Sequence, residues 1–192
     1  MKKVIVPLYF IFFIFFFSTK TECQSIKNLE TNNGFKNYKL GSKFNMAYGV
    51  KRKDGDGVDK VVIDYTKETI GDIPVKTIEL YYLKDTLAKI IVKIPPNYYQ
   101  KLLEGCNATF GLYTADISNN AEKTSDSSAS SINYTNNYIW KTKSFQMEYV
   151  YYYPKSGTGA YGNTTLHLAY VLNDFPLRLK RVKAYSNPAK NF

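Results

Sequence analysis

The chain has 192 residues and a formal net charge of +10, with 26 Lys and Arg against 16 Asp and Glu. Hydrophobic residues make up 44% of it, which is enough for a core and excludes a chain that is disordered throughout. Two Cys and one His are too few for a disulfide-rich scaffold, a tetrahedral zinc site or a multi-histidine metal site.

The N-terminus has the pattern of an export signal. A basic start, Met1–Lys3, precedes 14 residues without charge, Val4–Phe17. This stretch is too short to span a bilayer but fits the hydrophobic region of a secretory signal peptide. We therefore assign residues 1–23 as a signal peptide that is cleaved before Gln24, and we expect a periplasmic, envelope-associated or secreted protein. An uncleaved anchor is the alternative.

The two cysteines depend on that cleavage. Lipidation of Cys23 would be a second mode of membrane attachment, but Lys20 and Glu22 occupy the positions where a bacterial lipobox has a large aliphatic and a small residue. Cleavage before Gln24 leaves Cys106 as a lone thiol, which we expect to be a buried small hydrophobe. An earlier cleavage would let Cys23 and Cys106 pair.

The first elements of the mature chain are weakly marked. Residues 24–37 are polar and show no period, so we expect a flexible lead-in to a single domain over residues 38–192. Strands are expected at Met46–Arg52 and Val58–Thr66, because the turn-rich segment Lys53–Gly57 lies between them.

The clearest hairpin joins Val75–Leu83 to Leu87–Ile94. Aligning the apolar faces places Tyr82 opposite Ala88 and predicts a three-residue loop at 84–86. The apolar face consists of Ile78, Leu80, Tyr82, Ala88, Ile90, Val92 and Ile94. The other face is mixed and is expected to be wet; it consists of Thr77, Glu79, Tyr81, Lys89, Ile91 and Lys93.

One helix is predicted at about 97–109. Pro95 and Pro96 end the preceding strand, and Asn97 with Gln100 forms a pair typical of a capping box. Apolar residues then recur at helical spacing, namely Tyr99, Leu102, Leu103 and Cys106. We expect Leu102, Leu103 and Cys106 to dock on the sheet face that holds Leu80 and Ile90.

The remaining chain favours more strands around a loop. Residues 118–137 are rich in Asn, Ser and Thr and have little to bury, so we expect a flexible loop there. Strands are predicted at Tyr138–Lys143, Phe145–Tyr153 and Thr164–Leu172, and the last element, Leu177–Tyr185, is ambiguous. The predicted fold class is α+β: a single antiparallel sheet with one main helix, 97–109, on one face.

Two segments match known binding motifs only in part. The run Gly157–Gly162 matches the dinucleotide-binding pattern GxGxxG, but a strand pattern follows it where a helix is needed. Asp54–Asp59 is similar to a calcium loop, but Asp59 and Tyr65 stand at the positions of the required Gly and Glu. We expect a loop and a solvated turn, and neither a cofactor nor a metal ion.

Catalytic residues are also not recognisable. His167 lies in an apolar strand with no nucleophile motif nearby, so a structural role is the simpler interpretation. Glycoside hydrolysis needs two carboxylates, and Asp64, Glu79 and Glu148 lie on separate strands. We expect a protein that is not an enzyme, with a secreted hydrolase as the alternative.

The positive charge suggests the kind of partner. Basic residues cluster at Lys51–Lys53 and near the C-terminus, where Lys180, Arg181 and Lys183 are the candidate contacts. Export argues against nucleic acid and favours an anionic envelope component or glycan. We therefore expect a binding module with a basic, Tyr-rich surface; a carbohydrate-binding module, which needs coplanar exposed Tyr rings or Trp140, is the further alternative.

Overall fold

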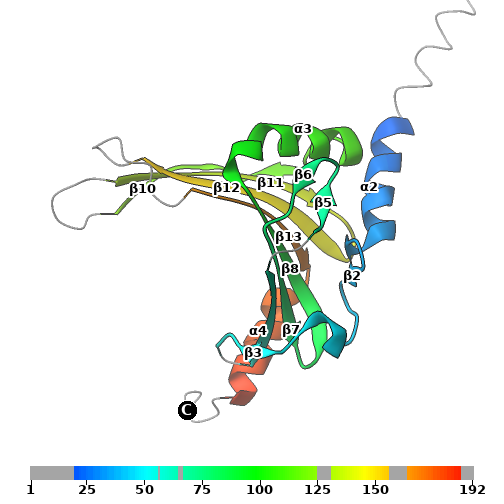
Figure 1. Ribbon diagram of the computed structural model, residues 1–192. Coiled ribbons are helices and arrows are strands. Elements are labelled where there is room, and N and C mark those ends of the chain that lie inside the picture. The colour runs from blue at the N-terminus through cyan, green and yellow to red at the C-terminus, as the bar shows by residue number, and fades with distance from the viewer. Residues whose placement is uncertain (1–19, 56, 65–66, 125–130, 156–163, 187–192) are drawn as a thin grey trace, which may run out of the picture.

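A strongly bent antiparallel sheet of nine strands dominates the protein (Figure 1). The computed structural model describes residues 20–55, 57–64, 67–124, 131–155 and 164–186. In spatial order the main strands are β10 (Asn119–Thr124), β11 (Ser131–Lys141), β12 (Phe145–Lys155), β13 (Thr165–Leu172), β8 (Thr86–Ile94), β7 (Thr77–Leu83), β4 (Val58–Asp64) and β3 (Arg52–Lys53). The ninth strand, β9 (Ala115–Asp116), also pairs with β11.

Within these described ranges, three helices and two small hairpins surround the sheet. The helices are α2 (Lys20–Asn32), α3 (Tyr99–Phe110) and α4 (Phe175–Ser186), and 3-10 turns lie at η1 (Met46–Tyr48) and η2 (Pro96–Tyr98). The hairpins pair β1 (Gly34–Phe35) with β2 (Tyr38–Lys39), and β5 (Thr69–Ile70) with β6 (Ile73–Pro74). The α+β class therefore holds, but a single sheet with one main helix is not confirmed, because α2, α4 and two small two-stranded sheets are also present.

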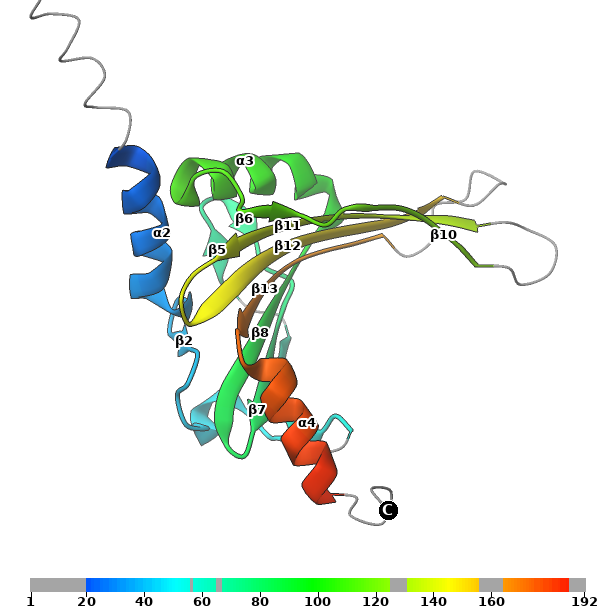
Figure 2. The same cartoon turned by 180° about the vertical axis from the view of Figure 1, so that it is seen from behind.

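The two faces of the sheet carry different chemistry. We call the first the core face; one row of paired residues across it runs Val61, Leu80, Ile90, Tyr170, Met147 and Trp140, all buried. Helix α3 packs on this face, and α4 lies on the opposite side of the sheet (Figures 1 and 2). We call that opposite face the lysine face, because it carries Lys60, Lys89 and Lys93.

Helix α3 confirms the predicted helix with small changes at its ends. It docks through Leu102, which is 1% exposed, and Cys106, while Leu103 is only partly buried. The helix ends at Gly111, whose φ of 78° is readily adopted only by glycine. Its N-cap is Tyr98 with no side-chain cap bond, so the expected capping box at Asn97 does not form.

The hairpin β7–β8 has a tighter turn than predicted. Lys84 and Asp85 form a two-residue turn, and both have positive φ, 48° and 62°, as a type I′ turn requires. Tyr82 pairs with Leu87, and the register shifts there, so Ala88 faces α4 rather than the core face. Because of this register shift, Leu80 still pairs with Ile90, as the apolar pattern predicted.

Two segments that we expected to lack regular structure contain defined elements. The lead-in at 24–37 falls largely within α2 and β1, where Leu29 and Phe35 are buried in the core. The expected loop at 118–137 is mostly the strands β10 and β11, and its residues 125–130 lie outside the described part of the chain. Pairing with β12 gives β11 backbone partners that its polar sequence does not reveal.

Candidate functional site

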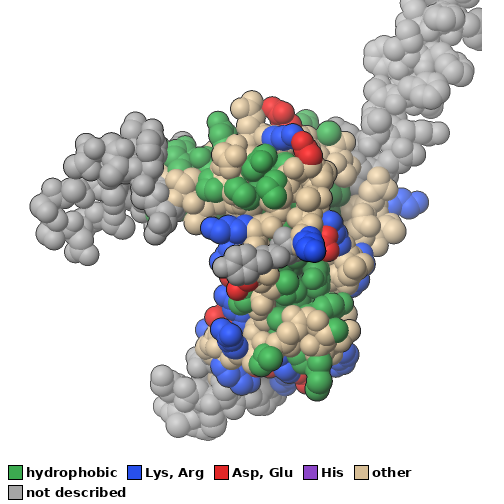
Figure 3. Space-filling model, viewed as in Figure 1, with side chains coloured by type: hydrophobic (Ala, Val, Ile, Leu, Met, Phe, Trp, Pro, Cys, Tyr) green, Lys and Arg blue, Asp and Glu red, His purple; other side chains and the backbone are tan. Residues whose placement is uncertain are grey.

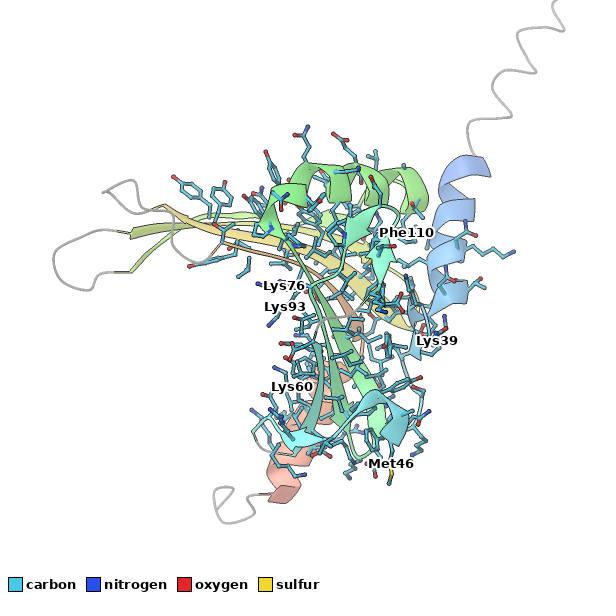
Figure 4. All side chains as sticks on the ribbon, in the orientation of Figure 1. Lys39, Met46, Lys60, Lys76, Lys93 and Phe110 are labelled. Carbon is cyan, nitrogen blue, oxygen red and sulfur yellow. The ribbon has the colours of Figure 1, made fainter. Side chains whose placement is uncertain are left out.

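The lysine face brings together polar residues from four strands. Strand pairing places Lys60, Tyr81 and Lys89 in one row across β4, β7 and β8. On the same face, the neighbouring row contains Glu79 of β7. The row beyond it contains Lys93 of β8 paired with His167 of β13. Figure 4 shows Lys60 and Lys93 on the same side of the sheet, away from Phe110 at the end of α3, and Figure 3 shows basic side chains along this part of the surface.

Glu79 is the anionic centre of this face. It is only 5% exposed, and its carboxylate accepts hydrogen bonds from Lys93 Nζ at 2.6 Å and Tyr81 Oη at 2.7 Å. Lys60 Nζ lies 3.3 Å from the same carboxylate. Burial by itself would raise the pKa of Glu79, but the hydrogen bonds from Lys93 and Tyr81 and the charges of Lys93 and Lys60 outweigh it and lower the pKa. Glu79 therefore stays ionised and organises the lysines around it.

His167 is an uncharged neighbour of these lysines at neutral pH. Burial, together with the positive charges of Lys89 and Lys93, lowers its pKa to about 4, against the weaker opposing effect of Glu79. Among the described residues, His167 has no hydroxyl or thiol as a hydrogen-bond partner, so no nucleophile–base pair is formed.

A cleft of about 440 Å³ lies between the lysine face and α4. Val58, Phe175 and Leu179 form its apolar wall, and Lys89, Lys183, Tyr81 and Asp54 supply its polar groups. Lys89 Nζ lies 5.7 Å from the centre of the Tyr81 ring, a cation–π contact. In the described part of the chain no carboxylate forms an ion pair with Lys89, so its charge remains available to a ligand.

The predicted contact residues Lys180, Arg181 and Lys183 all lie on α4 and are exposed. Val182, which is buried against the sheet, fixes the rotation of the helix. With 3.6 residues per turn, Lys180 and Lys183 fall on one flank of α4 and Arg181 on the other. Only Lys183 of the three lines the cleft, so the predicted cluster is divided by the helix.

Sequence reasoning missed two residues of the lysine face, Lys60 and His167. Lys89 and Lys93 were placed correctly on the wetter hairpin face. Lys60 joins them through the pairing of β4 with β7, and His167 joins them through the pairing of β13 with β8. Alternation in β4 and β13 is the signal that could have found them, but it does not give the register between strands.

The tyrosines form stacked contacts instead of a flat platform. Tyr99, Tyr151, Tyr153 and Tyr134 stack in sequence with centroid separations of 4.8, 5.1 and 5.1 Å and interplanar angles of 11°, 26° and 9°. Their ring faces therefore contact one another. Trp140 is fully buried and donates from Nε1 to the carbonyl oxygen of Gly111 at 2.8 Å. Neither arrangement offers the coplanar exposed rings that a sugar-binding platform needs.

The carboxylates considered for hydrolysis are spread over the sheet. Glu79 and Glu148 lie in one row but three strands apart, roughly 14 Å at the usual strand spacing. This exceeds the separation of about 5 to 10 Å in glycosidases. Asp64 is nearer to Glu79, but the lowered pKa of Glu79 is the reverse of what a general acid requires.

The two motif segments add no further chemistry. Asp59 of the calcium-like turn forms ion pairs with Lys51 and Lys53, at 3.5 and 2.6 Å, which neutralise its charge. No cluster of three metal-binding side chains occurs among the residues that were described. The glycine-rich run at 157–162 lies outside the described residues.

Comparisons with known proteins give no further guide to this site. Neither the family models, nor the curated proteins, nor the solved structures contain a match to this chain. Within the described ranges, every helix is too short or too polar to cross a membrane. The lysine face and its cleft are therefore the candidate functional site.

Proposed function

We propose that this protein is exported and works by binding an anionic partner, an envelope component or a glycan, in the cleft between α4 and the lysine face. The observation that carries this proposal is Lys89, a partly buried cation in a cleft without an ion-pair partner among the described residues. A cation held against Tyr81 and an apolar wall gains more from an anionic ligand than one in open water, because the local dielectric constant is lower.

The surroundings of Lys89 support the same function. Lys183 lines the cleft from α4, and Lys60 and Lys93 lie outside its lining on the same face of the sheet, where both form ion pairs with Glu79. Positive charge from separate elements therefore converges on one side of the molecule. Such a field attracts anionic polymers and is screened by salt over about 10 Å at 0.1 M.

The test is binding to polygalacturonate, a carboxylate polysaccharide, with uncharged dextran as the comparison polymer. We expect binding to polygalacturonate alone, weakening steadily as salt rises. Lys89→Gln should reduce the affinity about tenfold or more, since a hydrogen bond to a charged group is lost from a sheltered site.

The matched control uses the two flanks of α4. Lys183→Gln and Arg181→Gln remove the same charge from exposed positions on the same helix, but only Lys183 lines the cleft. We expect Lys183→Gln to weaken binding more than Arg181→Gln. Equal losses from both variants would show a diffuse charge effect, and salt-independent binding that Lys89→Gln leaves unchanged would refute the proposal.

A further inference from the structure

A second and larger cavity lies on the opposite side of the sheet, between α2, α3 and the β5–β6 hairpin. Its volume is about 730 Å³, within the range of small-molecule sites. Packed interiors leave few spaces larger than one water molecule, so a cavity of this size at the junction of three elements is a distinct structural feature. It shares no lining residue with the cleft at Lys89.

The walls of this cavity are apolar. Leu29 of α2, Phe35 of β1, Ile73 of β6, Leu102 of α3 and Leu168 of β13 each contribute a buried side chain. Phe110 closes one end, on the side of α3 toward α2 (Figure 4). A ligand that fits these walls must be mainly hydrocarbon.

The two cations that line the cavity are paired within the protein. Lys101 forms an ion pair with Asp72, and Lys36 forms one with Glu68. A third carboxylate, Glu104, accepts a hydrogen bond from Gln100. Among the described residues, no unpaired cation lines the cavity to receive an acidic head group, which favours an uncharged ligand.

The hydroxyl of Tyr170, a buried residue that lines the cavity, is available to a ligand. Tyr170 lies on the core face and lines the cavity, and its hydroxyl has no hydrogen-bond partner in the described part of the chain. Burial raises the pKa of Tyr170 and raises that of the neighbouring Cys106 thiol to about 12, so both groups are uncharged donors at neutral pH. A ligand oxygen that accepts a hydrogen bond would satisfy the Tyr170 hydroxyl.

We propose that this cavity binds an uncharged, mainly hydrocarbon molecule with one acceptor oxygen, such as a long-chain ketone, ester or alcohol, and that Tyr170 donates a hydrogen bond to that oxygen. The juxtaposition of apolar walls, paired rim cations and the buried Tyr170 hydroxyl assigns this ligand class. The site is separate from the anion cleft, so either can exist without the other.

The test uses 6-propionyl-2-dimethylaminonaphthalene, an uncharged fluorescent ketone, with the purified full chain. We expect a saturable blue shift of its emission at one probe per chain. Gly105 lines the cavity, has no positive φ and would place a Cβ in open space. Gly105→Trp should therefore fill the cavity and abolish binding, whereas Leu177→Trp, which places the same side chain at an exposed position of α4 outside the cavity, should bind the probe normally.

The role of Tyr170 is tested with two uncharged probes. Tyr170→Phe should weaken binding of the ketone by about three- to tenfold, the usual effect of one neutral hydrogen bond, and should leave the hydrocarbon diphenylhexatriene unaffected. Far-UV circular dichroism of each variant checks that it is folded.

Three outcomes would overturn the proposal. The first is ketone binding that does not saturate, and the second is Gly105→Trp binding as tightly as the wild type. The third is stronger, salt-dependent binding of the anionic probe 8-anilinonaphthalene-1-sulfonate, which would assign the cavity to acidic amphiphiles. Equal loss of both uncharged probes in a folded Tyr170→Phe variant would remove the hydrogen bond from the proposal.

Discussion

His167 shows how burial and neighbouring charges together set the pKa of one residue. Its pKa of about 4 is below the ordinary value of 6.5, so between these pH values the unfolded chain takes up a proton that the folded chain does not. The contribution of neutral His167 to the free energy of unfolding is therefore fully present above pH 6.5 and decreases as the pH falls toward 4. The full loss is about 3 kcal/mol, since one pKa unit corresponds to about 1.4 kcal/mol.

Urea unfolding between pH 6.5 and 5 measures this effect. His167 is the only histidine in the chain, and free Asp and Glu side chains titrate below this window. We expect the wild type to lose stability as the pH falls, and His167→Gln to show a nearly flat profile. Parallel profiles for the two proteins would mean that His167 is not held neutral by its burial and by the charges of Lys89 and Lys93.

At Gly57 it is the choice of residue that depends on the neighbouring helix. It lies just before β4 with a φ of 76°, and a Cβ placed there would lie 2.0 Å from Val182 Cγ1 of α4. The close approach of this turn to α4 therefore depends on a residue without a side chain. Sequence reasoning identified the turn but had no means of detecting the helix above it.

At the scale of elements, Gly57 and Gly55 provide a matched pair. Both have positive φ, but a Cβ at Gly55 has nothing within 4 Å. Gly55→Ala should cost about 1 kcal/mol of stability from backbone strain alone, whereas Gly57→Ala should cost a further 1–3 kcal/mol by displacing α4. Chemical denaturation measures both, and equal losses would show that α4 does not pack on the turn.

The β7–β8 hairpin shows why an apolar pattern and a loop length are separate predictions. The pattern required Leu80 opposite Ile90 and Ile78 opposite Val92, and both pairs are present. The three-residue loop was inferred by assuming a regular ladder up to the turn. A two-residue turn with a register shift at Ala88 satisfies the same core and also presents Ala88 to α4.

At the scale of the whole molecule, the central pairing of β8 with β13 joins residues that are more than 70 positions apart, such as Ile90 and Tyr170. One core cluster extends across this junction, from Val61 in β4 to Trp140 in β11. Neither half of the sheet can therefore bury its apolar side chains without the other. This arrangement predicts cooperative unfolding.

Two optical probes can check cooperativity, because Trp140 is the only tryptophan and is fully buried in β11. Tryptophan fluorescence reports on the side of the sheet that holds β11, and far-UV circular dichroism reports on the whole chain. We expect their urea transitions to coincide. An earlier transition by fluorescence would show that β10–β12 unfold as a separate unit.

Elements whose burial follows a local period could be predicted from the amino-acid sequence alone. The apolar alternation of β7, β8 and β12 and the helical spacing of Leu102 and Cys106 give the antiparallel strands, helix α3 and the burial of Cys106. These patterns suffice because each records which side of its own element meets the core. The signal peptide at 1–23 and export are also inferences from sequence, and they stay predictions.

The contacts between elements could be found only from the tertiary structure. Helix α2 and strand β11 have polar sequences. Helix α2 gains its order by placing Leu29 in the core, and β11 gains its order from backbone pairing with β12. The lysine face needs the register of β4, β7, β8 and β13, and the apolar cavity needs α2 beside α3 and β6. Such sites form between elements, and a one-dimensional pattern does not specify the register or packing that creates them.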